Sequence, residues 1–280
     1  MTIAVAINVG DSLVLASDSA TTQQWVTPAG HPDTINIWNS ANKVFNLRKG
    51  LPVGAMTWGQ ASIDGVSIGT LMKDLRLRLT GQDAACKDWA LDPDSYTIRE
   101  VADRVRSFLY DDRPAPQPSG PLGLMIAGYS ADSSQAEWFT ISVDASGCAG
   151  PIEVLPGGEA GVATFGQPEA FTRLIRGVST DLPQALVNLG VAPSEAGQYA
   201  EAIAAEVSRP IVFTGMPIGE VIDLADFLVE TTIRFVRFTP GDATVGGPIE
   251  IAALTKHEGF KWVKRKHYFP ASLNPTQESM

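Results

Sequence analysis

Hydrophobic and polar residues alternate at the start of the chain in the pattern of a β-hairpin. Ile3, Val5 and Ile7 are separated by smaller or polar residues, and a period of two is typical of a strand. Residues 10–12 are turn formers. Residues 13–16 are an apolar run long enough for a buried strand. The sequence therefore predicts strand, tight turn and strand, with the end of the second strand beside the start of the first.

Later segments alternate between strand and helix patterns. Strands are predicted at 43–47, 51–57, 122–127, 138–143, 162–165, 249–254 and 260–263. Helices are predicted from 59 or 60 to 79, from the capping box Thr97-Ile-Arg-Glu100 to 109, in two alanine-rich stretches broken by Pro193 and Pro210, and at 218–235. The polar and aromatic stretch 23–42 predicts either a projecting hairpin, as a subunit contact or a wall of a cleft, or a long surface loop.

The order of these elements predicts an α+β fold. Strands, helices, strands, helices and strands follow one another, which suits two antiparallel sheets packed face to face with helices outside. We find neither a linker nor an internal repeat. We therefore expect a single domain over residues 1–263, with a helical insertion at about 179–213. The remaining segment, 264–280, is basic and then polar, and we expect a loosely held tail.

Composition and net charge limit the kinds of partner that we expect this protein to bind. The chain has 280 residues, 44% hydrophobic and 19% charged, which provides ample material for a core. Its net charge of −10 argues against binding to nucleic acid or to anionic membranes. No apolar run is long enough to span a bilayer. The apolar N-terminus lacks a basic segment and is interrupted by Asp11, so we do not expect a signal peptide and expect a cytoplasmic protein.

The metal-binding residue types are sparse and scattered. They are Cys86, Cys148, His31, His257 and His267. They lack the spacing of metal ligands, and the two cysteines suit a reducing compartment. Residues 54–59 lack the ending of a phosphate-binding loop. We therefore expect no cofactor and no metal.

Thr2 has the chemistry of an N-terminal nucleophile. If Met1 is removed, Thr2 carries both a hydroxyl and a free α-amine. A hydroxyl needs a base, and such an amine can serve as one. Its ordinary pKa is about 7.7–8.0, so a useful fraction is neutral near pH 7. The predicted hairpin brings Asp18 back beside Thr2, although a threonine at position two usually has no special role.

The opening pattern resembles a known family. The matching residues are Thr2, Val5, Ile7, the Gly10-Asp11 turn, Leu13 to Asp18 and Lys43 to Leu47. They resemble the start of proteasome β-subunits, which are N-terminal-nucleophile (Ntn) hydrolases whose mature chain begins with the catalytic threonine. The spacing from Thr2 to Asp18 fits without a gap, whereas that from Asp18 to Lys43 is longer by roughly one short hairpin. Residues 165–174 and 245–251 are similar to the bacterial proteasome homologues of the Anbu type. The resemblance covers residues 1–50 well, the remainder patchily and 179–213 poorly.

This resemblance implies a fold and a catalytic group. The fold is a four-layer αββα sandwich, with two antiparallel sheets between helices. Thr2 would be the nucleophile, and a Lys43 cation beside it would favour loss of the hydroxyl proton and lower the pKa of the amine. Asp18 would offset that charge and orient the lysine. The alternatives are that Asp18 merely stabilises a turn, against which a nearby Lys43 favours a buried ion pair, and that Lys43 is an ordinary surface lysine.

Further site residues follow from the same resemblance. Backbone N–H groups at Thr57, Trp58 or Gly59, before the first helix, are the candidates for an oxyanion hole. Trp58 is alternatively a core aromatic or part of a specificity pocket. Thr22 corresponds to a residue that pairs with the substrate backbone, or is a turn threonine.

Two supporting positions depart from the family pattern. The element that holds the nucleophile's amine begins at Asp242 and has Val245 where the family has serine. Gln167 replaces a second serine. These changes bear on the strength of activity and on which groups position the amine.

Three functions remain open from the sequence. The first is a threonine-type endopeptidase that cleaves amide bonds in peptides, self-associated as a homo-oligomer. The second is a small-molecule amidase or acyl-transfer enzyme, which a narrow closed pocket would favour. The third is an inactive scaffold, which retention of Met1 would favour. The sequence leaves an ATP-dependent unfoldase partner undetermined.

Overall fold

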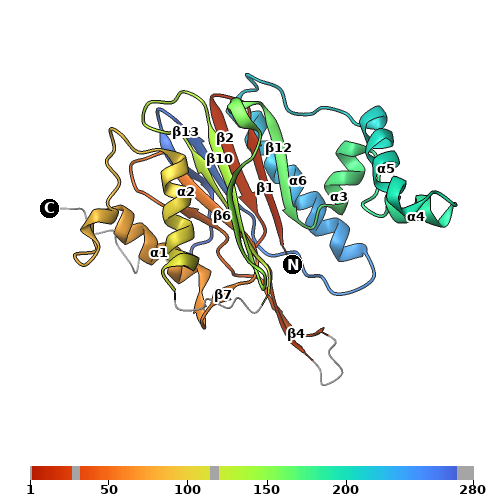
Figure 1. Cartoon of the computed structure of the whole chain (residues 1–280), viewed down its shortest axis with the longest axis horizontal. Helices are drawn as coiled ribbons and strands as arrows, with labels where there is room; N and C mark the ends of the chain where they lie inside the picture. The colour runs from red at the N-terminus through yellow and green to blue at the C-terminus, as the bar shows by residue number, and fades with distance from the viewer. Residues whose placement is uncertain (1, 27–31, 114–119, 270–280) are drawn as a thin grey trace.

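The structure is a computed structural model that describes residues 2–26, 32–113 and 120–269 (Figure 1). Within these ranges the chain forms 14 strands and six α-helices. The first large sheet has the order β12 (Gly161–Gly166), β1 (Ile3–Asn8), β2 (Ser12–Ser17), β13 (Glu250–Thr255) and β14 (Gly259–Lys264). The second has the order β11 (Gly147–Glu153), β10 (Glu137–Asp144), β9 (Leu122–Gly128), β6 (Val53–Gly59) and β5 (Val44–Asn46).

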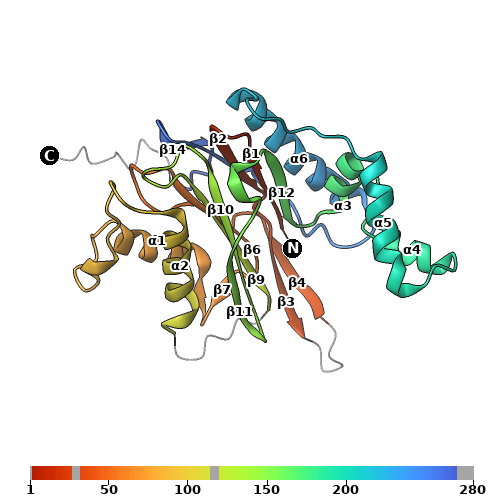
Figure 2. The same cartoon turned by 45° about the horizontal axis from the view of Figure 1, so that its top comes forward.

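Two small sheets complete the described strands. They are the hairpins β3 (Thr21–Val26) with β4 (Pro32–Trp38), and β7 (Ser62–Ile63) with β8 (Val66–Ser67). The β3–β4 hairpin projects from the body of the molecule in both views (Figures 1 and 2). The predicted projecting hairpin at 23–42 is therefore present, although residues 27–31 lie outside the described ranges.

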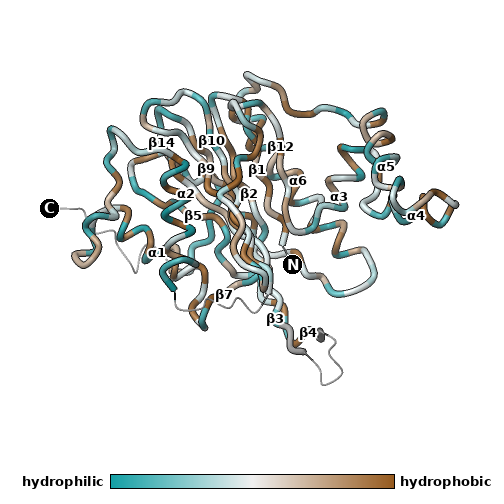
Figure 3. The backbone as a smooth tube through the Cα atoms, viewed as in Figure 1, coloured by the Kyte–Doolittle hydropathy of each residue, from teal (hydrophilic) through white to brown (hydrophobic). Residues whose placement is uncertain are grey.

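The helices are of unequal importance to the core. They are α1 (Ile68–Leu79), α2 (Ile98–Arg106), α3 (Glu169–Phe171), α4 (Leu182–Asn188), α5 (Pro193–Val207) and α6 (Ile218–Phe238). Hydrophilic and hydrophobic colours alternate along α1 and α2, as amphipathic helices require (Figure 3). Helix α4 buries no residue, and α5 buries three alanines.

The expected fold class requires correction. A four-layer αββα sandwich has two sheets between two helical layers, whereas the described strands form four sheets. Strands β3 and β4 pair with each other in a separate sheet, and large apolar side chains of β4, Ile35 and Trp38, are exposed rather than packed on the large sheets. Helices α4 and α5 lie at the far edge of the molecule, away from both large sheets (Figure 1). The alanine stripe of α5 offers too little apolar surface to cover a sheet.

Three apolar clusters hold the main elements together. One joins the second sheet to α1 and α2, and another joins the first sheet to α6. The third lies between the two large sheets and includes Leu15, Met56 and Met125. Strand β1 contributes to two of them, because Ile3, Val5 and Ile7 face α6 while the alternate alanines face the other sheet.

The first hairpin is deeply buried. All residues of β1 and β2 are buried, and β2 is the central strand of its sheet. A strand buried on both faces cannot slip in register without exposing apolar side chains. The N-terminus is thereby held at a defined position in the sheet.

Helix α1 begins later than the sequence predicts. Residues 62–67 form the β7–β8 hairpin instead, with Asp64 and Gly65 at φ values of 51° and 76° in its turn. Ser67 then caps α1 by accepting the Thr70 N–H at 3.2 Å. The predicted cap of α2 is confirmed, because Thr97 Oγ1 accepts the Glu100 N–H at 3.0 Å. None of the described helices is both long and apolar enough to cross a membrane.

Candidate functional site

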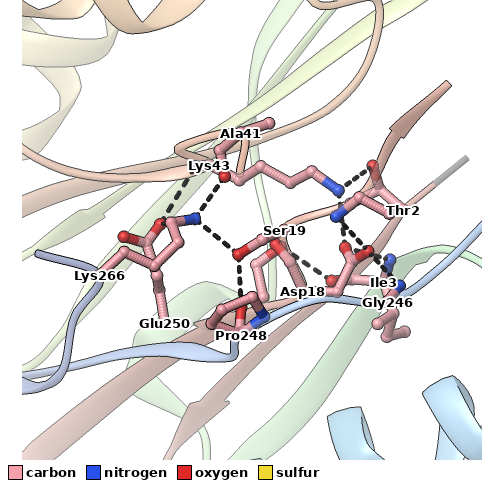
Figure 4. Close-up of polar contacts among 12 residues, drawn as sticks. Thr2, Ile3, Asp18, Ser19, Ala41, Lys43, Gly246, Pro248, Glu250 and Lys266 are labelled. Atoms are coloured by element: carbon pink, nitrogen blue, oxygen red, sulfur yellow. Dashed lines mark hydrogen bonds and ion pairs between the residues drawn. The ribbon is translucent and has the colours of Figure 1, made fainter. Parts of the chain in front are cut away.

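The β1–β2 register brings Asp18 beside the start of the chain. Ala4 lies opposite Ser17, and the Asp18 N–H donates to the Ile3 carbonyl at 3.2 Å. The Ile3 N–H in turn donates to Asp18 Oδ1 at 3.1 Å. The predicted proximity of Asp18 and the N-terminal strand follows from this pairing (Figure 4).

Lys43 bridges Thr2 and Asp18. Its Nζ donates to Thr2 Oγ1 at 2.8 Å and to Asp18 Oδ1 at 2.7 Å. The Lys43 side chain is 6% exposed and that of Asp18 is fully buried. Lys43 directly precedes β5, whose pairing with β6 fixes the backbone from which the side chain extends. The structure thus brings together the three residues that the resemblance singles out as catalytic (Figure 4).

The Asp18 carboxylate is held on both oxygens. Besides Ile3 and Lys43 on Oδ1, the N–H groups of Ala20 and Gly246 each donate to Oδ2 at 3.0 Å. These donors satisfy both oxygens of the buried carboxylate. The carboxylate therefore has a fixed position from which it orients the lysine.

Burial lowers the pKa of Lys43 from its ordinary value, because desolvation penalises the ammonium. The charge of Asp18 and its hydrogen bond act in the opposite sense. A cation that lies 2.8 Å from a hydroxyl oxygen lowers the energy of the corresponding alkoxide. Low local dielectric increases that effect.

Thr2 itself is held through its carbonyl as well as its hydroxyl. The Gln167 N–H donates to the Thr2 carbonyl at 2.8 Å. Gly166 has φ of 89°, and a Cβ there would lie 1.9 Å from the Thr2 carbonyl oxygen. Only glycine permits this close approach of β12 to Thr2. Gln167 is therefore placed beside Thr2 through its main chain.

The structure narrows the oxyanion candidates. The Thr57 N–H already donates to the Lys43 carbonyl at 2.9 Å, and its hydroxyl donates to Gly123 at 3.1 Å. The Thr57 N–H is therefore already occupied, and the prediction of Thr57 as an oxyanion donor is wrong. Successive N–H groups of a strand point to opposite edges. The Trp58 N–H therefore faces β9, and the Gly59 N–H faces the edge that carries Lys43. The expectation that a helix begins directly after Gly59 is also wrong, because the β7–β8 hairpin lies between Gly59 and α1.

Trp58 has a packing role. Its ring stacks on Phe165, with centroids 4.0 Å apart and planes at 11°. Phe165 lies opposite Ala4 in the β1–β12 pairing. This stack joins the two large sheets close to the N-terminal end of β1, which agrees with the alternative interpretation of Trp58 as a core aromatic.

The structure places the remaining predicted residues on β3, in a cavity beside the end of α6 and in the cluster under α6. Thr22 is on β3, opposite Ile37. Asp242 is exposed, and with Gln167 it lines a cavity of about 380 Å³ beside the end of α6. Val245, at the position of the family serine, is buried in the cluster under α6. Its side chain thus contributes to packing.

Two functional candidates escaped the sequence reasoning. Glu250 and Lys266 form an ion pair at 3.1 Å, next to the Lys43 segment. The available signal was a glutamate between Ile249 and Ile251 at the start of β13, since buried strands rarely carry an unpaired charge. The structure describes no cluster of three or more histidine, cysteine, aspartate or glutamate residues that could hold a metal ion within residues 2–26, 32–113 and 120–269.

A scan of the chain against protein-family models finds no match. A search of curated proteins also finds no significant relative.

Proposed function

We propose that this protein is a threonine-type hydrolase that cleaves amide bonds in peptides, with Thr2 as the nucleophile after removal of Met1. The observation that carries this proposal is the Lys43 ammonium, which lies 2.8 Å from Thr2 Oγ1 and 2.7 Å from Asp18 Oδ1. Three polar groups meet here in a buried setting, and buried polar clusters of this kind gather at functional sites.

Each residue has a role in the proposed reaction. Thr2 Oγ attacks the carbonyl carbon, and the α-amine of Thr2 takes the hydroxyl proton. Lys43 stabilises the negative charge on Oγ, and Asp18 keeps the lysine in place. The N–H of Gly59 is the proposed oxyanion donor.

The second half of the reaction releases the products. The protonated amine of Thr2 gives its proton to the leaving nitrogen, and the amide C–N bond breaks. An ester between Thr2 and the acyl group remains. Water then attacks this ester, with the amine again as base, and restores the free threonine.

The proposal includes a homo-oligomer. Large apolar side chains are exposed on and beside α5 and α6; they include Leu189, Tyr199, Ile203, Phe227 and Phe238. Leu189 and Phe238 are 83% and 79% exposed, and exposed apolar surface supports a protein contact. Sedimentation at micromolar concentration should give a mass above the 29.8 kDa of one chain. A single 29.8 kDa species would contradict this part of the proposal.

An α′,β′-epoxyketone peptide tests the chemistry. This reagent closes a ring with both the hydroxyl and the free amine of an N-terminal threonine. Intact mass should first show loss of Met1, and peptide mapping should then place the adduct on Thr2. Thr2→Ala should give no adduct, whereas the matched Thr2→Ser variant, which keeps a hydroxyl, should still react.

Peptide hydrolysis provides the deciding measurement. Turnover should be lost in folded Thr2→Ala and kept in Lys264→Met, which removes a surface lysine far along the chain. Undiminished hydrolysis by Thr2→Ala would refute the proposed nucleophile.

A further inference from the structure

A second buried ion pair lies behind the Thr2 site. Lys266, just after β14, meets Glu250 at the start of β13, with 3.1 Å between Lys266 Nζ and Glu250 Oε2. Their side chains are 5% and 2% exposed. Desolvating two charges is unfavourable unless further hydrogen bonds satisfy them. A pair kept so deeply buried therefore calls for a specific role.

Lys266 also contacts the segments that carry Asp18 and Lys43. Its Nζ donates to Ser19 Oγ at 2.6 Å and to the Ala41 carbonyl. Ser19 follows Asp18, and Ala41 lies two residues before Lys43. An ammonium has three N–H donors, and here Glu250, Ser19 and Ala41 accept all three (Figure 4).

The same contacts tie the two segments to each other. The Ala41 N–H donates to the Ser19 carbonyl at 2.9 Å, and Ser19 Oγ donates to the Pro248 carbonyl. Glu250 Oε2, which meets Lys266, also accepts the Lys43 N–H at 3.4 Å. Lys266 and Glu250 thus fix the backbone on each side of the Lys43–Asp18 pair.

The charges of Lys266 and Glu250 also affect the pKa of Lys43. Asp18 and Glu250 favour the Lys43 ammonium, whereas Lys266 disfavours it. Burial lowers the pKa of Lys266 too, although Glu250 and Asp18 oppose that change. Glu250 also faces Tyr268. Burial raises the pKa of Tyr268, the charge of Glu250 raises it further, and Arg265 lowers it.

We propose that Lys266 is a positioning residue for the Thr2 site: through its ion pair with Glu250 it holds the Lys43 segment in place and sets the charge balance around the Lys43 ammonium. Its catalytic meaning rests on the proposed function, because Lys43 acts on Thr2. The described start of the expected loose tail therefore serves the site, since Lys266 is anchored there.

Opposite charge removals test this coupling. Lys266→Met removes a like charge and leaves Glu250 unpaired, so the pKa of Lys43 should rise by about one unit. Glu250→Gln removes the carboxylate and leaves Lys266 charged, so the pKa of Lys43 should fall by a similar amount. The double variant removes both charges and should return the pKa toward that of the parent protein.

The measurement is an NMR titration of lysine labelled with ¹³C at Cε, with the Lys43 signal assigned by its loss in Lys43→Arg. Lys266→Arg keeps the charge and should leave the Lys43 titration in place. Lys264→Met removes a lysine two residues away that pairs with Asp226 on the surface, and it should have no effect. Should a single variant fail to fold, the double variant and Lys266→Arg still allow comparison with the remaining single variant.

The two proposals fail in different ways. Opposite shifts of the Lys43 titration support the role of Lys266, even when Thr2 of the parent protein does not react with the epoxyketone; that result would refute only the hydrolase. The role of Lys266 would be overturned if the Lys43 titration did not move in the folded charge variants and if the labelling of Thr2 declined at the same alkaline pH in all of them. If both proposals are correct, the alkaline pH at which labelling of Thr2 declines should shift in the same direction as the pKa of Lys43.

Discussion

Two lysine–aspartate pairs of nearly equal length show how differently the same contact behaves in two parts of this molecule. Lys43 and Asp18 lie 2.7 Å apart, with side chains 6% and 0% exposed. Lys264 and Asp226 lie 2.6 Å apart, with side chains 49% and 31% exposed. The distances do not separate the pairs, whereas solvent does. Water screens the surface pair, while the buried pair must balance its own charges and can act strongly on a neighbouring hydroxyl.

The largest expected effect comes from removing the buried cation. In Lys43→Met, Thr2 Oγ loses the ammonium at 2.8 Å, so the rate of epoxyketone labelling and of peptide hydrolysis should fall by about 10²–10⁴-fold. Rates of the purified variant measured under saturating and subsaturating substrate check this. A rate equal to that of Lys264→Met would remove the functional distinction between the two pairs.

Loss of the buried anion should affect stability as well. Asp18→Asn leaves the Lys43 ammonium buried without its counter-charge, so the free energy of unfolding should fall by about 3–5 kcal/mol. Urea denaturation followed by circular dichroism measures the change. Asp226→Asn is the matched control, and a loss there as large as in Asp18→Asn would contradict the burial argument.

A partly buried carboxylate should fall between these extremes and respond to acid. Burial works against ionised Glu169, but hydrogen bonds from Thr180, Ser179 and Arg173 outweigh it and lower its pKa from 4.5 to about 2. Because the folded pKa lies below the unfolded one, this stabilisation is fully present above pH 4.5 and is lost as the pH falls toward 2.

The difference in stability between the parent protein and Glu169→Gln checks this prediction. At neutral pH it should be well below the roughly 3 kcal/mol that the full shift would give, because water screens this carboxylate, and it should shrink between pH 4.5 and 2. Denaturation at several pH values, with both proteins in the same buffers, isolates the contribution of Glu169. A difference independent of pH would show that the hydrogen bonds do not favour the ionised form.

The smallest effect is expected at the surface pair itself. Lys264→Met should change the free energy of unfolding by about 0–1 kcal/mol. Raising the salt concentration should reduce even that difference, because exposed charges are screened. Thermal unfolding at low and high salt measures it, and a loss comparable to that of Asp18→Asn would show that exposure does not separate the pairs.

Several features could be predicted from local patterns alone. The alternation of Ile3, Val5 and Ile7 and the turn after them depend on residues that are neighbours in the chain, and they predicted the hairpin that brings Asp18 to Thr2. The cap at Thr97 was equally local. The start of α1 was missed because an apolar stripe does not reveal the tight turn at Asp64 and Gly65.

The site divides along the same line. By itself the sequence determined the β1–β2 hairpin and the candidate chemistry of Thr2, Asp18 and Lys43, with the last resting on a family resemblance. Tertiary structure alone decided that Lys43 Nζ reaches both partners and that Thr57 is already bonded. It also decided the pairing of the strands into four sheets and of Glu250 with Lys266. The physical reason is range: turns and caps are set by adjacent residues, whereas buried charges are paired only when distant segments pack and exclude water.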